Sequence, residues 1–140
     1  MDQVQRARLS SVVFSDMVRT VHGTGQEVSR ILRDDGLNPA QLQLLLAVRE
    51  APGSAQRALG ERLGTTPANV SMLVSRLENR GWLSREAAGA ANRLWLTDVG
   101  QALADRLGAA QQAFMAARFA ALGDDDLETL AQLLRRACDD

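Results

Sequence analysis

The sequence has no lysine and no tyrosine, and its 140 residues include one histidine and one cysteine. A single cysteine, Cys138, excludes a disulfide within one chain and a metal cluster built on cysteine. One imidazole and one thiol leave too few ligands for a transition-metal site, and no glycine-rich phosphate loop is present. We therefore expect no metal and no cofactor. So few nucleophiles and bases also make an enzyme a poor interpretation.

Long apolar runs are also missing. No stretch of about 18 uninterrupted apolar residues occurs, so no membrane span is expected. The opening MDQVQRARLS lacks the apolar segment of a signal peptide. An apolar share of 46% is that of a globular protein. These features predict a cytoplasmic protein with no membrane partner.

Positive charge is scarce overall but concentrated in the middle of the chain. The net charge of −1 is unusual for a nucleic-acid binder, because such domains are generally basic. Residues 49–95 hold seven arginines against four glutamates, so this segment carries +3 and the flanks carry −4, the difference between −1 and +3. All 16 basic residues are arginine. Arginine suits bidentate contacts to phosphate or guanine, although genomic base composition explains its exclusive use equally well.

The central segment predicts two helices joined by a tight turn. Ser54 is expected to cap a short helix over 55–63, which Gly64 closes in a left-handed conformation. Thr66 and Pro67 then open a second helix, and Gly81 ends it. This order is that of a helix-turn-helix, although such pairs also occur as plain packing units. The predicted inward face of the second helix is Val70, Leu73, Val74 and Leu77.

The outward face of the second helix favours DNA contact. It offers short polar groups, one methionine and one arginine, which can approach base edges in a major groove, and the alternative is a solvated helix face. Residues 82–86 and 92–97 follow as two predicted strands of a hairpin. Around this core, residues 8–33, 98–122 and 127–137 repeat apolar positions at steps of four and three, which is typical of helix interfaces.

The chain resembles the MarR family of bacterial winged helix-turn-helix regulators over about residues 37–107. The resemblance lies in "LNPAQLQLLLAVREAPGSAQRALGERLGTTPANVSMLVSRLENRGWLSRE", in "RLWLTDVGQALADRL" and in the order of the elements. It implies a mainly α fold with a small β-hairpin, in which a winged helix-turn-helix (37–97) is flanked by dimerisation helices (1–36 and 98–140) in one compact chain. It also implies a homodimer that binds pseudo-palindromic double-stranded DNA, interpreted here as a repressor released by a small-molecule effector.

The resemblance places the recognition helix over Thr66 to Arg76. Asn69 and Arg76 are predicted to contact base edges, and Ser71 and Met72 to pack in the groove. The family usually has an Asp-Arg pair near the wing tip, but the matching "AAGAANR" lacks the Asp. Either Arg93 takes the minor-groove role from a shifted position, or the tip makes only backbone contact. The predicted DNA-contact set is Ser54, Arg57, Thr65, Thr66, Ala68, Asn69, Ser71, Met72, Ser75, Arg76, Arg85 and Arg93, with Ser54, Arg57, Thr66 and Arg85 on phosphates.

The terminal helices are expected to form the dimer and to border an effector site. In the family, the usual effector site is the crevice between the dimer helices and the winged module. His22 either holds a small aromatic or anionic effector there or is an ordinary exposed histidine. The other function considered is a winged-helix module that binds a protein partner with weak or lost DNA readout. Predicted effector residues are Met17, Arg19, His22 and Trp95, and predicted dimer contacts are Phe14, Val18, Phe114, Leu127, Leu130 and Leu134.

Overall fold

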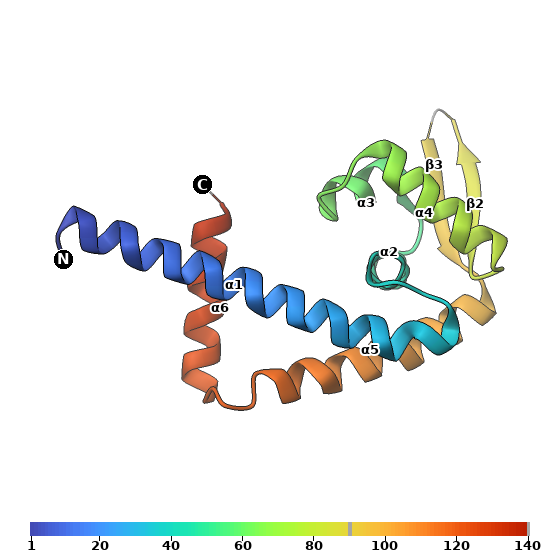
Figure 1. The fold of residues 1–140 in the computed structure, drawn as a ribbon. Helices are drawn as coiled ribbons and strands as arrows, with labels where there is room; N and C mark the ends of the chain where they lie inside the picture. Colours follow the sequence, from blue (N-terminus) through green and yellow to red (C-terminus); the bar gives the residue numbers. More distant parts are fainter. Residues whose placement is uncertain (90, 140) are drawn as a thin grey trace. The chain divides into compact units, whose positions relative to one another are not determined.

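The fold is mainly helical, with one small sheet (Figure 1). The computed structural model describes residues 1–89 and 91–139. These divide into two compact units, Met1–Ala104 and Asp105–Asp140. In chain order, the elements are α1 (Gln3–Leu32), the 3-10 helix η1 (Arg33–Asp35), α2 (Pro39–Glu50), β1 (Ser54–Ala55), α3 (Gln56–Arg62), α4 (Pro67–Asn79), β2 (Leu83–Ala88), β3 (Ala91–Leu96), α5 (Asp98–Arg118) and α6 (Asp124–Cys138).

Side-chain caps set the starts of α2, α4 and α5, and the cap of α4 is the one predicted above. At α2, Asn38 Oδ1 accepts from the Gln41 backbone N–H at 2.9 Å, and Gln41 Oε1 accepts in return from the Asn38 N–H at 3.0 Å. At α4, Thr66 Oγ1 accepts from the Asn69 N–H at 3.2 Å. At α5, Thr97 Oγ1 accepts from the Gly100 N–H at 3.0 Å. Each bond satisfies an N–H that would otherwise lack a helical partner.

The sheet contains one strand more than the predicted hairpin. It is antiparallel with order β1-β3-β2, and Ser54 pairs with Leu94 while Leu83 pairs with Leu96. The prediction that Ser54 caps α3 is wrong, because Ser54 lies in β1 and its hydroxyl donates to the Ala51 carbonyl at 2.7 Å. The N-cap of α3 is Ala55, without a side-chain bond. Pairing with a strand forty residues away decides this conformation, and no local signal reveals it.

The wing strands extend further than predicted. Ala87 pairs with Asn92, and Ala88 pairs with Ala91, so most of the predicted loop over 87–91 belongs to β2 and β3. Gly89 adopts φ 63°, a left-handed conformation that glycine takes without steric cost. Ala90, also in that predicted loop, lies outside the described residues.

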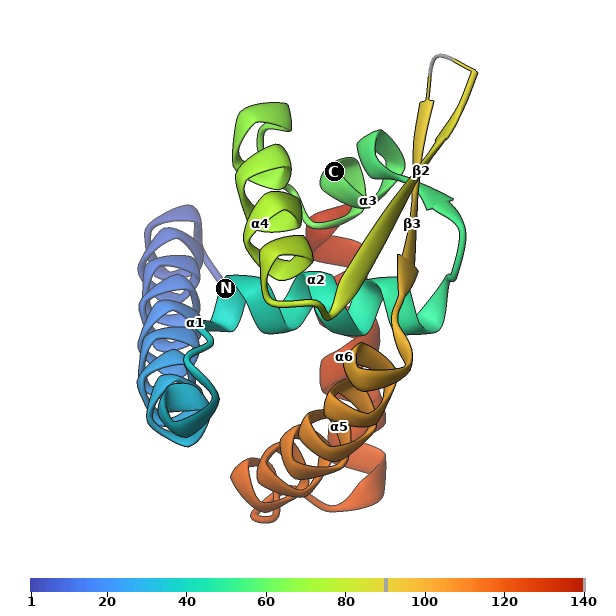
Figure 2. The ribbon, with the colours of Figure 1, turned by 90° about the vertical axis from the view of Figure 1, so that its right-hand side faces the viewer.

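The core of the first unit lies where α2 meets α4 and the sheet. Its fully buried side chains include Leu44, Leu45, Val74, Leu77 and Leu94. Figure 2 shows α4 and the β2–β3 hairpin standing on the same side of α2. A Cβ on Gly60 of α3 would lie 2.7 Å from Val70 Cγ2 of α4, so the absence of a side chain lets these helices approach closely. This packing fixes the angle at which α4 is presented.

The boundary between the two units lies inside α5, whereas the sequence-based division falls before residue 98. The first turns of α5 are joined to the winged module because Thr97 Oγ1 donates to the Gly81 carbonyl at 2.6 Å and Arg49 Nη1 to the Ala104 carbonyl at 3.4 Å. Gly100 is buried beside the backbone of Trp82. The division into three segments, their roles and the expectation of one compact chain stay predictions.

The second unit contains the rest of α5 and all of α6. α5 ends at Arg118, four residues before the predicted end, and backbone bonds from Ala120 to Ala117 and from Leu122 to Phe119 close the turn. Three aspartates occupy the first turn of α6 and two arginines its last turn, an arrangement that complements the helix dipole. Within the described parts of the chain, no helix has the length and apolar character needed to span a membrane.

Candidate nucleic-acid interface

Helix α4 has one buried face and one polar exposed face. Val70, Leu73, Val74 and Leu77 are buried, as predicted. Ser75 is half-buried, and Glu78, the one acidic residue of α4, is half-buried near its end. The exposed side is therefore free of carboxylates that would repel a duplex. The exposed residues of α4 are Pro67, Ala68, Asn69, Ser71, Met72, Arg76 and Asn79.

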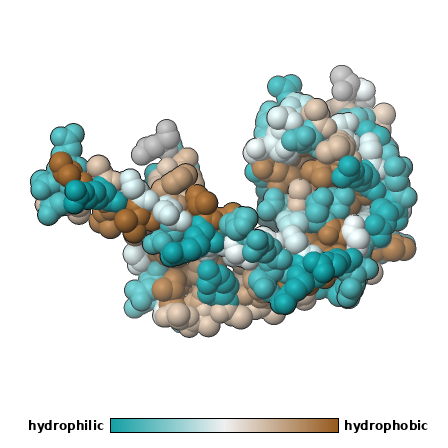
Figure 3. Space-filling view, viewed as in Figure 1, coloured by the Kyte–Doolittle hydropathy of each residue, from teal (hydrophilic) through white to brown (hydrophobic). Residues whose placement is uncertain are grey.

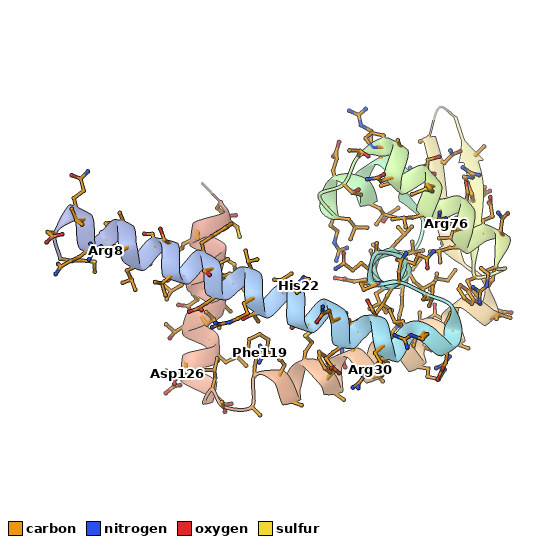
Figure 4. The ribbon with its side chains drawn as sticks, viewed as in Figure 1. Arg8, His22, Arg30, Arg76, Phe119 and Asp126 are labelled. Atoms are coloured by element: carbon orange, nitrogen blue, oxygen red, sulfur yellow. The ribbon has the colours of Figure 1, made fainter. Side chains whose placement is uncertain are left out.

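Arg76 is the cation of this face, and its guanidinium projects from α4 (Figure 4). The described residues supply no hydrogen bond or ion pair to its side chain. Arg85, in contrast, donates from Nη2 to Glu78 Oε1 at 3.0 Å, and both side chains are about one third exposed. Arg85 must share or leave that carboxylate to meet a phosphate. Arg76 would need to break no such bond to meet a base or a phosphate.

The predicted phosphate contacts near α3 differ in their exposure and in the bonds that they already make within the chain. Arg57 is 3.4 Å from Glu61 in a highly exposed pair, which is worth little and opens easily. Thr66 is exposed and Thr65 half-buried at the start of α4. The Ser54 hydroxyl proton is engaged by the Ala51 carbonyl, so Ser54 is not arranged here to donate to a phosphate.

The described part of the wing tip has no charged side chain. The tip includes Ala87, Gly89 and Ala91. Arg93 lies further down β3, paired in register with Glu86, and its Nη1 donates to the Gly53 carbonyl at 2.9 Å. This bond ties Arg93 to the turn before β1. A minor-groove role for Arg93 would require the bond to open.

A cavity of about 900 Å³ lies between β1, α3, the start of α4 and β3. Of the residues that line it, Arg57 and Thr65 belong to the predicted DNA-contact set, whereas Gln56 and Asn92 do not. Gln56 lines the cavity, and its Oε1 is buried without a hydrogen-bond partner in the described structure. Gln56 directly follows β1, a strand that the sequence does not predict, so no pattern in the sequence marks Gln56 as a cavity residue.

Arg80 is a second residue with an unassigned role. Its Nη2 donates to the Asp35 carbonyl at 2.8 Å, and its guanidinium carbon lies 4.1 Å from the centroid of the Trp82 ring. These contacts join the end of α4 to the segment between α1 and α2. The spacing Arg-Gly-Trp across a left-handed Gly81, with φ 77°, is the one sequence signal that could have indicated the stacking.

The predicted effector residues lie on two elements: Met17, Arg19 and His22 on α1, and Trp95 in β3. Arg19 pairs with Asp16 at 2.7 Å, and His22 Nε2 lies 3.2 Å from the amide nitrogen of Gln26, so both are engaged along α1. Trp95 packs over Gly53, where a Cβ would lie 2.7 Å from its ring. Neither the cavity described above nor a second one, of about 280 Å³ near the C-terminal end of α4, is lined by Met17, Arg19, His22 or Trp95.

The predicted dimer residues are exposed or half-buried in the single chain. Phe14 is 68% exposed and Val18 is 51% exposed on α1, where further large apolar side chains are exposed (Figure 3). Leu127 is 42% exposed on α6, and Phe114, Leu130 and Leu134 are half-buried. Over residues 1–89 and 91–139, no three His, Cys, Asp or Glu side chains gather as a metal site would require.

Helices α3 and α4, the turn between them and the hairpin that follows define a winged helix-turn-helix protein. Residues 35–93 match the model of the MarR family. The regulator YkoM of Bacillus subtilis, of helix-turn-helix type, is 28% identical over 140 residues, 97% of this chain and 88% of YkoM. Residues 35–93 therefore resemble the winged helix-turn-helix module of MarR-family proteins, and the relative that matches nearly the whole chain is a transcriptional regulator.

Solved structures share this fold. The transcriptional regulator SlyA superposes with a TM-score of 0.85 at 18% identity and covers 91% of this chain and 92% of its own. The transcriptional regulator PcaV of Streptomyces coelicolor superposes with a TM-score of 0.73 at 26% identity and covers 90% of this chain and 89% of its own. The predictions of family and fold class are thereby confirmed.

Proposed function

We propose that the protein is a cytoplasmic, homodimeric repressor that binds a pseudo-palindromic duplex and is released by a small molecule. The observation that carries this proposal is the exposed face of α4, with Asn69, Ser71, Met72 and the unengaged Arg76. A major groove admits one α-helix, and amide and guanidinium groups pair bidentately with adenine and guanine. Asn69 and Arg76 would read bases, while Thr66 and Arg57 would meet phosphates.

Two solved relatives support the binding of DNA and of a small-molecule ligand. A mutant of MarR from E. coli has been solved with operator DNA, and it superposes with a TM-score of 0.79 at 18% identity, over 98% of this chain and 99% of that one. PcaV has been solved with its natural ligand. The larger cavity lies between α4 and the wing, where a DNA strand would pass. We therefore add Gln56 and Asn92 to the proposed contacts.

The exposed apolar residues of α1 support a dimer. Val12, Val13, Phe14, Val18 and Val21 are each at least half exposed, which is costly in water unless a partner covers them. A two-fold axis would present two copies of α4, so half-sites should lie about 34–36 Å apart along the duplex.

Replacing Phe14 by glutamate is expected to split the dimer. A carboxylate placed in an apolar interface without a partner costs about 3–5 kcal/mol, while the chain's own core does not use this exposed side chain. Light scattering should give the chain mass of 15.1 kDa instead of twice that value, with unchanged helical circular dichroism. The matched control is Ser15→Glu, which adds the same charge about 100° around the helix and should leave the mass doubled. A Phe14→Glu protein that stays dimeric contradicts the assigned interface.

Binding to duplexes selected from a random pool is expected to weaken about 1,000-fold between 50 and 200 mM salt if about six phosphates are neutralised per dimer. Arg57→Gln should make the slope of log affinity against log salt shallower by about two, one for each subunit. Asn69→Ala should lower affinity about tenfold or more and leave that slope unchanged, because it removes a base contact and no charge. Equilibrium gel-shift titrations at several salt concentrations measure both quantities.

A winged-helix module that binds a protein partner is the second candidate function. It is favoured by the uncharged described residues of the wing tip and by the engagement of Arg85 and Arg93 within the chain. The same titrations separate the two functions. A chain that retains no duplex from the pool, or retains duplexes with no dependence on salt, supports the partner module and refutes the repressor.

A further inference from the structure

Residues 80–82, directly after α4, contact the segments that follow α1 and precede α5. Arg80 Nη2 donates to the carbonyl of Asp35, the last residue of the 3-10 helix that continues from α1, at 2.8 Å. The Trp82 carbonyl accepts from the N–H of Thr97, the residue before α5, at 3.1 Å. The end of α4 is therefore bonded to the ends of two helices that are proposed to form the dimer.

Three contacts hold the guanidinium of Arg80. It donates to Asp35, and its carbon lies 4.1 Å from the centroid of the Trp82 ring, on which it stacks. A Cβ on Gly36 would lie 2.9 Å from Arg80 Nη1, so the guanidinium occupies space that a glycine leaves open. Gly36 takes φ 68°, which glycine adopts without steric cost. Because the contacts with Asp35 and Gly36 are made to backbone, they fix Arg80 against the chain segment itself.

A small rotation at this end of α4 becomes a large displacement at its other end. Helix α4 has 13 residues and is therefore about 20 Å long, at about 1.5 Å per residue. A rotation of about 10° about the Arg80 end would move the Thr66 end by about 3.4 Å, which is the rise of one base pair. The angle between α4 and α1 thus decides which base pairs two recognition helices can meet together.

We propose that Arg80 is a positioning residue, which holds α4 at one angle to α1 and so sets the half-site spacing that the dimer accepts. This inference rests on the proposed function, in which two copies of α4 read one duplex. Arg80 contacts no base in this role and acts through the backbone of Asp35 and through Trp82. It therefore controls the spacing of the half-sites and not their sequence. Because Arg80 is exposed, its loss should change the stability of the fold little.

The first experiment measures the position of α4 without DNA. Spin labels are attached through Ser29→Cys on α1 and Ala68→Cys on α4, in a Cys138→Ser chain that lacks the exposed natural cysteine. An excess of unlabelled chain keeps one labelled subunit in each dimer. Pulsed electron resonance should give one narrow distance, which Arg80→Gln shifts or broadens by about 3 Å or more. Arg19→Gln, which removes a charge from an ion pair along α1, is the matched control and should leave the distance unchanged.

The second experiment measures spacing, with selected duplexes that are lengthened or shortened by one base pair between unchanged half-sites. The unaltered chain should prefer one spacing by about tenfold or more, and Arg80→Gln should reduce this preference to about threefold or less. The affinity of Arg80→Gln for a duplex with a single half-site should equal that of the unaltered chain. Arg80→Lys keeps a donor for the Asp35 carbonyl and should restore most of the preference. Arg19→Gln should keep all of it.

Two results would overturn the inference. They are an unchanged distance in Arg80→Gln and an unchanged preference for one spacing. Weaker binding to a single half-site, together with a shallower salt dependence, would instead assign Arg80 to a phosphate. An unaltered chain that retains no duplex refutes the proposed function and the spacing role with it, whereas a shifted distance in Arg80→Gln would still show that Arg80 holds α4.

Discussion

Replacing Arg76 by alanine is expected to cost about 1–3 kcal/mol of DNA binding at each recognition helix, and so about 2–6 kcal/mol for a dimer. The guanidinium is exposed on the carboxylate-free face of α4, and no bond within the described chain competes for it. The substitution leaves the inward face of α4 intact, so the free energy of unfolding should change little. Fluorescence anisotropy with a selected duplex measures the loss, and a panel of single base changes shows whether discrimination disappears at one position in each half-site.

Arg76→Lys decides what Arg76 contacts. Lysine keeps the charge but lacks the planar fork that pairs with guanine. If Arg76 reads a base, the lysine variant should behave almost like the alanine variant. Recovery of most of the affinity in Arg76→Lys would instead assign Arg76 to a phosphate, and unchanged affinity in Arg76→Ala would remove it from the interface.

Replacing Gly100 by alanine is expected to lower the free energy of unfolding by about 3 kcal/mol or more. A Cβ at this position would lie 1.8 Å from the carbonyl oxygen of Trp82 and 2.7 Å from its carbonyl carbon. Both atoms belong to backbone, and the same oxygen accepts from the Thr97 N–H at 3.1 Å, so neither can move without disturbing the start of α5. Urea unfolding followed by circular dichroism, at fixed protein concentration, measures the change.

Gly23→Ala is the matched control for this prediction. Gly23 is also a helical glycine, but no heavy atom beyond its chain neighbours and the nearby backbone of its own helix lies within 4 Å of the position its Cβ would take. Alanine there should leave stability unchanged or raise it by up to about 1 kcal/mol, because alanine favours the helix. A Gly100→Ala protein with the same urea midpoint as Gly23→Ala would show that α5 does not approach Trp82 this closely.

Local signals in the sequence were sufficient where a few neighbouring residues decide the structure. Asn38 and Thr66 each bind a backbone N–H three residues ahead, so the caps of α2 and α4 could be predicted from spacing. Gly64 and Gly81 take the left-handed conformation that ends a helix, with φ of 66° and 77°. The buried face of α4 followed from its helical period.

Local signals were insufficient where residues far apart in the chain meet. Ser54 has the chemistry of a cap, yet pairing with Leu94 makes it part of a strand. Arg85 and Arg93 look like free cations in the sequence, but Glu78 and the Gly53 carbonyl engage them. The orphaned oxygen of Gln56 depends on the packing around α3. None of these partners is visible in the spacing of residues along the chain.

The sequence by itself determined the helix-turn-helix, its polar outward face and the resemblance to MarR regulators, because caps, turns and amphipathic periods act over only a few residues. The tertiary structure alone decided which arginines remain available. An arginine side chain takes the nearest acceptor in space, and the fold brings acceptors to Arg80, Arg85 and Arg93 but none from the described residues to Arg76.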